Sequence, residues 1–204
     1  MPTPPVTGDR AATRARLLAS AQRLFSEAGY GGVGVREIAA GADVNAALVN
    51  RYFGSKLALF AEAVGDSFTI GDLLVGERST LGDRLARYLV RPRPGGFDPT
   101  LVLLRSAAHP EAGPVLRSAL AEQVTTPLAD WLGGPEARER AGLVVATLFG
   151  FTLARDVIGV SVLADREPLV GHLGAVLQRL IDGRRSESPD IAGTRTLPSP
   201  PPQS

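Results

Sequence analysis

Residues 38 to 53 read IAAGADVNAALVNRYF and contain two short apolar segments with a turn between them. Their spacing predicts a helix, a tight turn and a second helix, which is the arrangement of a helix-turn-helix. Ala39 is small where the two helices must cross closely, and Val44 would fill the turn. The side chain of Asn45 can accept a hydrogen bond from the free amides that open the second helix.

The second of these helices has an outward face whose chemistry suits the major groove of DNA. Val49 and Phe53 are four residues apart and are expected to point inward. The outward set then consists of Ala46, Ala47, Leu48, Asn50 and Arg51. Asn can bond adenine and Arg can bond guanine through paired hydrogen bonds, while Ala or Leu can touch a thymine methyl group. Arg51 could equally hold a phosphate.

Helical spacing continues on both sides of this segment. An apolar stripe over residues 17 to 28 predicts a helix before it, and Ser55 can cap a further helix after it. Lys56, the only lysine in the chain, lies in the first turn of that helix, where free amides already favour a phosphate. Additional helices are expected near residues 80–90, 99–108, 111–132, 135–162 and 166–183, with Pro and Gly breaks between them.

The predicted fold is therefore all-α, with a three-helix DNA-binding head and a larger helical bundle. We assign residues 10–57 to the head and residues 58–184 to the bundle. The Pro-rich segment 1–9 and the Pro/Ser-rich segment 185–204 are expected to be disordered tails, because neither can bury enough apolar area to become ordered.

The composition excludes several classes of function. The chain has 204 residues and no cysteine, which rules out disulfide scaffolds, thiolate metal sites and cysteine nucleophiles, and suits the reducing cytoplasm. His109 and His172, the only histidines, are each expected to be structural. No nucleophile motif or phosphate-binding glycine loop is present, so we expect no enzyme, no cofactor and no metal.

The distribution of charge and the hydropathy of the chain indicate the cellular compartment of the protein. The first 60 residues carry a net charge of +3 and the remainder −2, so only the predicted head is basic. The N-terminus lacks the pattern of a signal peptide, and the longest uncharged apolar run, 141–154, is shorter than a bilayer requires. We therefore expect a soluble, cytoplasmic protein with no membrane partner.

The stretch AQRLFSEAGYGGVGVREIAAGADVNAALVNRYFGSKLALF, residues 21–60, resembles the N-terminal domain of the TetR family of transcriptional regulators. The resemblance implies a repressor that binds double-stranded DNA at a palindromic operator as a homodimer and is released by a small-molecule effector. The positions that match those used for bases or phosphates are Asn45, Ala46, Ala47, Leu48, Asn50, Arg51, Tyr52 and Lys56. The sequence departs from the family pattern in three places: Gly34 stands where Ser or Thr normally caps the helix, Asp43 replaces the turn glycine, and Asn50 replaces the common tyrosine. Aspartate tolerates the left-handed conformation of such a turn better than most other residues.

The remaining two thirds of the chain are less specific. The stretch LLRSAAHPEAGPVLRSALAEQVTTPLADWLGG, residues 103–134, resembles the C-terminal domains of actinobacterial members of the family. Candidate residues for an effector pocket, combining apolar walls with a few polar groups, are Phe97, Arg105, His109, Gln123, Trp131, Thr147 and Phe149. Ordinary packing is the alternative explanation for each of them.

Two stripes indicate a homodimer interface through the helices near 135–162 and 166–183. The first is a strip of small residues every four positions: Gly142, Ala146, Gly150 and Ala154. The second is apolar, with Gly171 and Ala175 beside it: Leu169, Leu173, Val176, Leu177, Leu180 and Ile181. Both could instead be intramolecular core.

An alternative function is that of a helical interaction protein that keeps the three-helix head but does not bind DNA. Asn50, Arg51 and Lys56 argue against this alternative.

Overall fold

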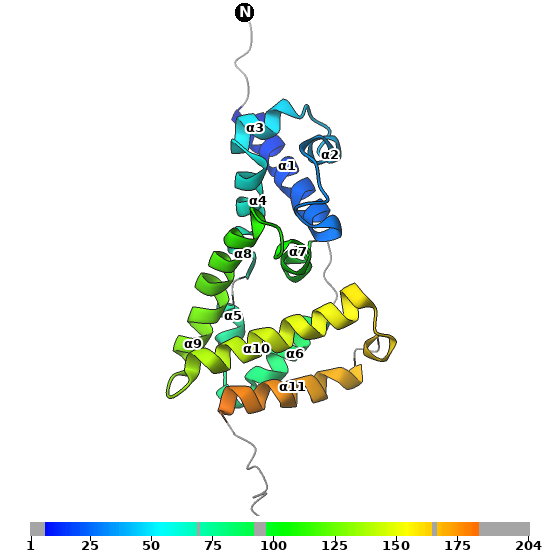
Figure 1. Ribbon diagram of the computed structural model, residues 1–204. Coiled ribbons are helices and arrows are strands. Elements are labelled where there is room, and N and C mark those ends of the chain that lie inside the picture. The colour runs from blue at the N-terminus through cyan, green and yellow to red at the C-terminus, as the bar shows by residue number, and fades with distance from the viewer. Residues whose placement is uncertain (1–6, 69, 92–96, 165–166, 184–204) are drawn as a thin grey trace, which may run out of the picture.

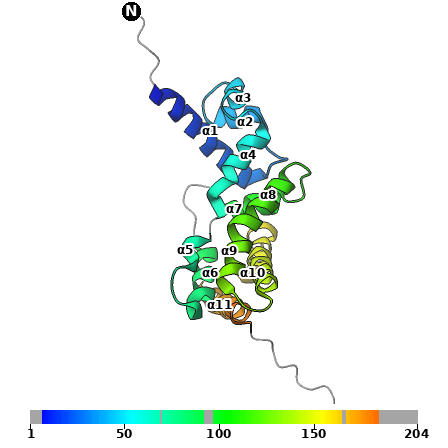
Figure 2. The same cartoon turned by 90° about the vertical axis from the view of Figure 1, so that its left-hand side faces the viewer.

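The computed structural model of the chain describes residues 7–68, 70–91, 97–164 and 167–183. Regular structure in this part of the chain is entirely helical, as predicted, and forms a small head on a larger body (Figure 1). A view from the side shows the head at one end of the molecule and the last helix at the other (Figure 2). The predicted tail 185–204 and residues 1–6 lie outside the described residues.

The head contains α1 (Thr7–Ala28), α2 (Val35–Gly41) and α3 (Ala47–Phe53), and α4 (Lys56–Val64) leads from it into the body. Helix α1 starts inside the segment 1–9 that we expected to precede the head. Because Pro5 is the last proline before it, nothing in the backbone prevents a helix from residue 7 onward. The Ser55 hydroxyl accepts a hydrogen bond of 3.0 Å from the N–H of Ala58 and caps α4, as predicted.

Among the described residues of the head, Gly29, Asp43 and Gly54 have a positive φ, a backbone conformation that few residues adopt. Gly29 ends α1 with a φ of 70°, and a Cβ atom there would lie 2.7 Å from the carbonyl oxygen of Arg105, so glycine is required on both counts. Asp43 takes a φ of 53° in the turn between α2 and α3. Aspartate tolerates this left-handed conformation better than most residues, which explains how it can replace the usual glycine.

The body is built from several short helical segments and three longer helical runs. In chain order these are η1 (Gly65–Phe68), α5 (Gly71–Leu74), η2 (Arg78–Thr80), α6 (Leu81–Val90), α7 (Pro99–Ser106), α8 (Ala112–Leu120), η3 (Ala121–Thr125), α9 (Thr126–Leu132), α10 (Ala137–Thr152), η4 (Leu153–Ile158), η5 (Ser161–Leu163) and α11 (Glu167–Asp182). The predicted helix near 111–132 is the continuous run α8–η3–α9. Its π-helical middle part, η3, precedes Pro127, which has no N–H for the regular helical bond and needs extra room in the preceding turn.

The buried apolar side chains form two clusters. The first joins the head to the top of the body, because Phe25 of α1 and Phe60 of α4 pack in the same cluster as Val102 of α7 and Leu116 of α8. The second lies among α6, α9, α10 and α11. The head therefore shares its core with the body and is not packed as a separate unit.

The apolar stripe of α11, which we expected in the homodimer interface, lies mostly inside the body. Leu173, Leu177 and Ile181 are buried in the second cluster, where α11 packs mainly on α6. The two helices cross closely, since a Cβ atom on Gly82 would lie 2.4 Å from the carbonyl oxygen of Gly174. The prediction is wrong for these three residues, whereas Val176 of the same stripe is exposed. An apolar stripe does not reveal whether its own chain or a second copy covers it.

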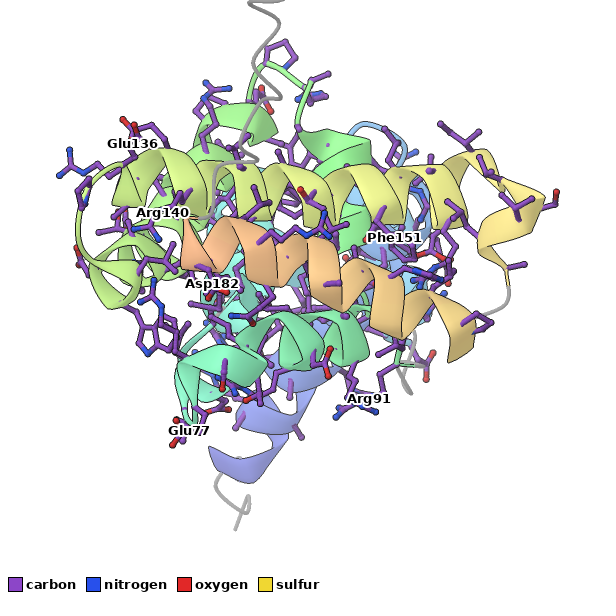
Figure 3. The ribbon with its side chains drawn as sticks, turned by 90° about the horizontal axis from the view of Figure 1, so that it is seen from below. Glu77, Arg91, Glu136, Arg140, Phe151 and Asp182 are labelled. Carbon is purple, nitrogen blue, oxygen red and sulfur yellow. The ribbon has the colours of Figure 1, made fainter. Side chains whose placement is uncertain are left out.

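Two arginines donate hydrogen bonds to carbonyl groups at helix C-termini at the lower end of the body. Arg78 donates hydrogen bonds of 2.9 Å to the carbonyl oxygen of Leu132 and 2.8 Å to that of Ile181, at the ends of α9 and α11. Arg140 also donates to the Ile181 oxygen, at 2.8 Å. Figure 3 shows Arg140 and Asp182 at the same end of the adjacent helices α10 and α11. Cationic side chains at helix C-termini satisfy the last free carbonyl groups there.

Helix α10 continues without a break into η4 to form a single helix, Ala137–Ile158. Among the described residues, this 22-residue helix is the only one long and apolar enough to cross a membrane by length and composition. The uncharged part of this helix is still the run 141–154, which is shorter than a bilayer requires, because Arg138, Glu139 and Arg140 precede it. Core helices of soluble proteins pass the same test, and Arg155 and Asp156 would have to lose their hydration in a bilayer.

Candidate nucleic-acid interface

Helix α3 is short and is held at both of its ends. Asn45 Oδ1 accepts a hydrogen bond of 2.8 Å from the N–H of Ala47, which confirms the predicted cap. At the other end, the N–H of Gly54 donates to the carbonyl oxygen of Asn50 at 2.9 Å, with Gly54 at a φ of 79°. Because seven residues form few internal bonds, these ends contribute much of the local definition of the helix.

The inner and outer faces of α3 differ sharply in burial. Val49 is 0% exposed and Phe53 is 9% exposed, so both point into the first cluster as predicted. Ala47, Asn50 and Arg51 are exposed, and their spacing places them on one side of the helix. In the described part of the chain, the side chains of Asn50 and Arg51 make no hydrogen bond or ion pair, so they are available to a ligand.

The other predicted DNA-contacting residues surround this face. Asn45 is exposed, but its side-chain oxygen is used to cap α3. Ala46, Leu48 and Tyr52 are partly buried against the first cluster, so each presents only part of its surface to the outside. The face lies at the end of the molecule farthest from α10 and α11 (Figure 1).

Lys56 is directed toward the protein itself. Its Nζ donates a hydrogen bond of 2.6 Å to the carbonyl oxygen of Tyr30 and lies 4.1 Å from the centre of the Tyr30 ring. Burial lowers the pKa of Lys56, against the opposing effect of the carboxylates of Glu111 and Glu37. No sequence pattern predicts this contact, because Tyr30 and Lys56 meet only after α1 and α4 have packed together. The predicted phosphate contact would use the remaining donors of the ammonium group.

Further basic side chains lie on α1, and sequence reasoning did not select them. Arg14 forms an ion pair of 2.5 Å with Glu62 and lies over the ring of Phe53, 4.9 Å from its centre. Arg16 and Arg23 line an open groove of about 460 Å³ beside the turn of the helix-turn-helix. They add positive charge to the head next to α2 and α3.

A small cavity lies in the body below the head. Its volume is about 70 Å³, and among its described lining residues there is no Asp, Glu, Lys, Arg or His. The walls come from η1, α5, α6, α7, α8, η3 and α10, and from the residue that precedes α5. They comprise Ser67, Phe68, Ile70, Leu73, Leu85, Tyr88, Leu89, Pro99, Thr100, Leu120, Val124, Val145, Leu148 and Phe149.

Of the seven predicted effector-pocket residues, Phe149 alone lines this cavity. Gln123 is close to it, because its side chain donates to the carbonyl oxygen of Gly65 and accepts from the N–H of Phe68 at 3.3 Å. Phe97 is partly buried against the first cluster instead. Residues from so many segments share no sequence spacing that could have identified the cavity.

The other four candidates lie in separate places and do not form a site with the cavity. Arg105 donates to the carbonyl oxygen of Ser26, and the ring of His109 packs edge-on against Tyr30, with 4.7 Å between ring centres. Trp131 lies under the guanidinium of Arg78, 5.4 Å from the ring centre. The Thr147 hydroxyl donates to the carbonyl oxygen of Leu143 at 2.8 Å, within its own helix.

The outer side of α10 and α11 is apolar and has no neighbour in the described part of the chain. Leu143 is 54% exposed and Val176 is 48% exposed. A Cβ atom added at Gly142, Gly150 or Gly171 would meet nothing within 4 Å. The small-residue strip of α10 thus faces outward for most of its length, unlike Leu173, Leu177 and Ile181 of α11, which are buried.

Comparison with known proteins agrees with this architecture. Residues 17–63 match the family model for bacterial regulatory proteins of the tetR family. Residues 79–181, just over half of the chain, match the model of the tetracyclin repressor-like C-terminal domain. No curated protein matches the chain at a significant level.

Several solved structures share the fold. A transcriptional regulator from Rhodococcus sp. RHA1 is 28% identical with a TM-score of 0.63, over 83% of this chain and 96% of that one. A TetR-family regulator from Streptomyces coelicolor A3 is 26% identical with a TM-score of 0.55, over 88% and 99% respectively. NalD, the secondary repressor of the MexAB-OprM multidrug efflux pump in Pseudomonas aeruginosa, has the same fold at 19% identity, with a TM-score of 0.62 over 82% and 95%.

Proposed function

The chain belongs to the TetR family of bacterial regulatory proteins, and we propose that it is a repressor that binds a palindromic operator as a homodimer and is released by a small-molecule effector. As a member of this family it is a transcriptional regulator with a DNA-binding domain, not an enzyme. The observation that carries the proposal is the outer face of α3, where Asn50 and Arg51 are exposed and make no bond to any described residue, on a helix whose inner face is buried.

In the proposed complex α3 lies in the major groove. Asn50 and Arg51 read base edges or hold phosphates, and Ala47 approaches the groove floor. The partly buried neighbours and Lys56 contribute contacts at the edge of this face. A protein with this target works where the chromosome is, in the cytoplasm.

The test is selection from a pool of random duplexes, followed by footprinting of genomic fragments. We expect an enriched pseudo-palindrome whose half-sites are about one helical turn, or a multiple of it, apart. The double variant Asn50→Ala/Arg51→Ala tests the role of α3. It should leave the fold intact, since both side chains are exposed and make no bond in the described chain. If the wild type protects no fragment at low salt, or if the double variant selects the same sequence, α3 is not the reading helix.

The homodimer is proposed to form through the exposed strip of α10 and the adjoining edge of α11. Small residues such as Gly142, Ala146 and Gly150 allow another helix to approach closely, and exposed Leu143 and Val176 supply apolar area. A two-fold interface here would leave both heads free.

Analytical ultracentrifugation tests this interface. The wild type should sediment at twice the chain mass of 21.4 kDa, whereas Gly150→Leu, which fills the strip, should shift the population toward the monomer. Ala121→Leu enlarges an exposed residue on the run α8–η3–α9 and should leave the mass unchanged. A dimeric Gly150→Leu variant would place the interface elsewhere.

The effector is proposed to bind in the cavity of the body. Its described lining residues include no Asp, Glu, Lys, Arg or His, and an unpaired charge there would lose hydration without compensation, so the effector should be uncharged and largely apolar. Its volume of about 70 Å³ is well below the roughly 300 Å³ of ordinary ligand sites, so binding must widen it.

A thermal-shift screen of neutral and charged compounds tests the class of effector. A ligand at about 100 times its dissociation constant adds about 2.7 kcal/mol of stability to the folded state. Val145→Phe adds bulk to the cavity wall and should abolish the shift, whereas Ala121→Leu should keep it. A charged compound that binds equally well to the Val145→Phe variant would contradict the assignment of the cavity.

A further inference from the structure

Tyr30 connects the head to the body. It follows α1 in the chain and is only 4% exposed. Its hydroxyl donates a hydrogen bond of 2.7 Å to Oε2 of Glu111, beside α8, and its backbone N–H donates one of 2.9 Å to Oγ of Ser106, at the end of α7. A single head residue is thus bonded to both sides of the turn between α7 and α8.

The ring of Tyr30 is also enclosed by both parts of the molecule. Lys56 covers it from the start of α4, and His109 packs against it from the turn between α7 and α8. Phe60 meets it edge-on with 5.0 Å between ring centres. Since Lys56 comes directly after the short connection from α3, the same contacts reach the end of the proposed reading helix.

Neighbouring contacts reinforce this junction at its other side. The N–H of Asp98 donates a hydrogen bond of 3.0 Å to Oγ of Ser26, and Arg105 donates to the carbonyl oxygen of the same serine. Burial, followed by the bond to Glu111, raises the pKa of Tyr30 to about 12, so its hydroxyl remains protonated and can donate at neutral pH.

We propose that Tyr30 and Glu111 are positioning residues that hold each head at a fixed angle to the body, so that the two heads of a dimer can occupy both half-sites together. This inference rests on the proposed function. Binding of the second head is an intramolecular step whose effective concentration depends on how often that head already has the correct orientation. Binding of one head to an isolated half-site depends only on the contacts that this head itself makes with the DNA.

The head angle can be measured without DNA. The chain has no cysteine, so Ala40→Cys on α2 and Arg138→Cys on α10, both exposed positions, allow one spin label on the head and one on the body. Labelled chains diluted with unlabelled chains give the distance within one protomer by pulsed electron paramagnetic resonance. We expect Tyr30→Phe and Glu111→Ala to broaden the distance distribution, whereas Glu122→Gln, which alters an exposed carboxylate farther along the same helical run, should leave it unchanged.

The same variants are then compared on the selected palindrome and on a duplex in which one half-site is scrambled. Loss of one hydrogen bond at each junction should weaken binding to the palindrome about three- to tenfold, with less than a twofold change on the half-site duplex. Glu111→Ala removes the same hydrogen bond from the side of the body and leaves the sequence of the head unchanged. An unchanged affinity of this variant for the half-site duplex would therefore also show that α3 is intact.

The possible outcomes separate this inference from the proposed function. Unchanged distance distributions in both variants would overturn the positioning role, whether or not the protein binds DNA. Equal losses on palindrome and half-site would also overturn it, because the hydroxyl would then serve the fold of the head itself. A wild type that selects no duplex but whose distance distribution broadens on Tyr30→Phe would refute the proposed function and support the mechanical role of Tyr30.

Discussion

Replacing Arg51 by alanine should separate the stability of the protein from its affinity for DNA. Arg51 is exposed and makes no hydrogen bond or ion pair in the described part of the chain, and its only local role is that of a cation in the last turn of α3. A cation at that position contributes at most about 0.3–1 kcal/mol to an exposed helix. Arg51→Ala should therefore change the free energy of unfolding by less than about 1 kcal/mol.

The effect on DNA binding should be much larger if Arg51 reads a base. A paired contact to guanine is worth about 1–3 kcal/mol, and a dimer makes two such contacts, so the loss is about 2–6 kcal/mol. This corresponds to a fall in affinity of about 30-fold to 10⁴-fold. If Arg51 holds a phosphate instead, affinity falls for every sequence, and the salt slope decreases by about 0.9 per contact, or about 2 for the dimer.

Fluorescence anisotropy on the selected palindrome, on single-base variants of it and over a salt series distinguishes the two roles. Arg87→Ala is the control, because Arg87 is also exposed and lies in the last turn of a helix, but on α6 of the body. If Arg51→Ala has the same affinity for the palindrome and the same salt slope as Arg87→Ala, the outer face of α3 is not the surface that binds DNA. A large drop in melting temperature would also contradict this assignment, since Arg51 has no bond to any residue that the structure describes.

Other variants test the remaining contacts. Lys56→Ala removes the hydrogen bond to the Tyr30 carbonyl oxygen and should lower the free energy of unfolding by about 1 kcal/mol. It should weaken DNA binding equally for all sequences, whereas a change in base preference would mean that Lys56 contacts a base. Asn45→Ala removes the α3 cap and should cost about 1 kcal/mol in urea unfolding, against no change for exposed Ala40→Ser. Gly82→Ala places a Cβ atom 2.4 Å from the Gly174 carbonyl oxygen and should lower the free energy of unfolding by about 1–3 kcal/mol. An unchanged midpoint of urea unfolding would mean that α6 and α11 do not approach each other this closely. Because the pKa of Tyr30 is about 12 when folded and 10.0 is its ordinary value, the folded state holds the phenolic proton more tightly than the unfolded chain does. The stability this confers is present below pH 10 and is lost as the pH rises through 12, and Tyr30→Phe should remove that part of the alkaline loss in a pH series of urea unfolding.

The sequence by itself determined the parts of the molecule that depend on neighbours along the chain. Helical periodicity and Pro/Gly breaks predicted an all-helical fold, and the cap by Asn45, the left-handed turn at Asp43 and the cap by Ser55 are all interactions within a few residues. The inward direction of Val49 and Phe53 followed from their spacing of four in the same way.

Only the tertiary structure decided what each apolar face and each long side chain meets. Lys56 turns toward Tyr30, the apolar stripe of α11 packs on α6 at the crossing of Gly82 and Gly174, and the cavity collects residues from many segments. An apolar stripe shows that a helix must be covered but is indifferent to the element that covers it, because the hydrophobic effect has no direction. The face of α3 could thus be read from local spacing, whereas the junction at Tyr30 that positions it required the assembled fold.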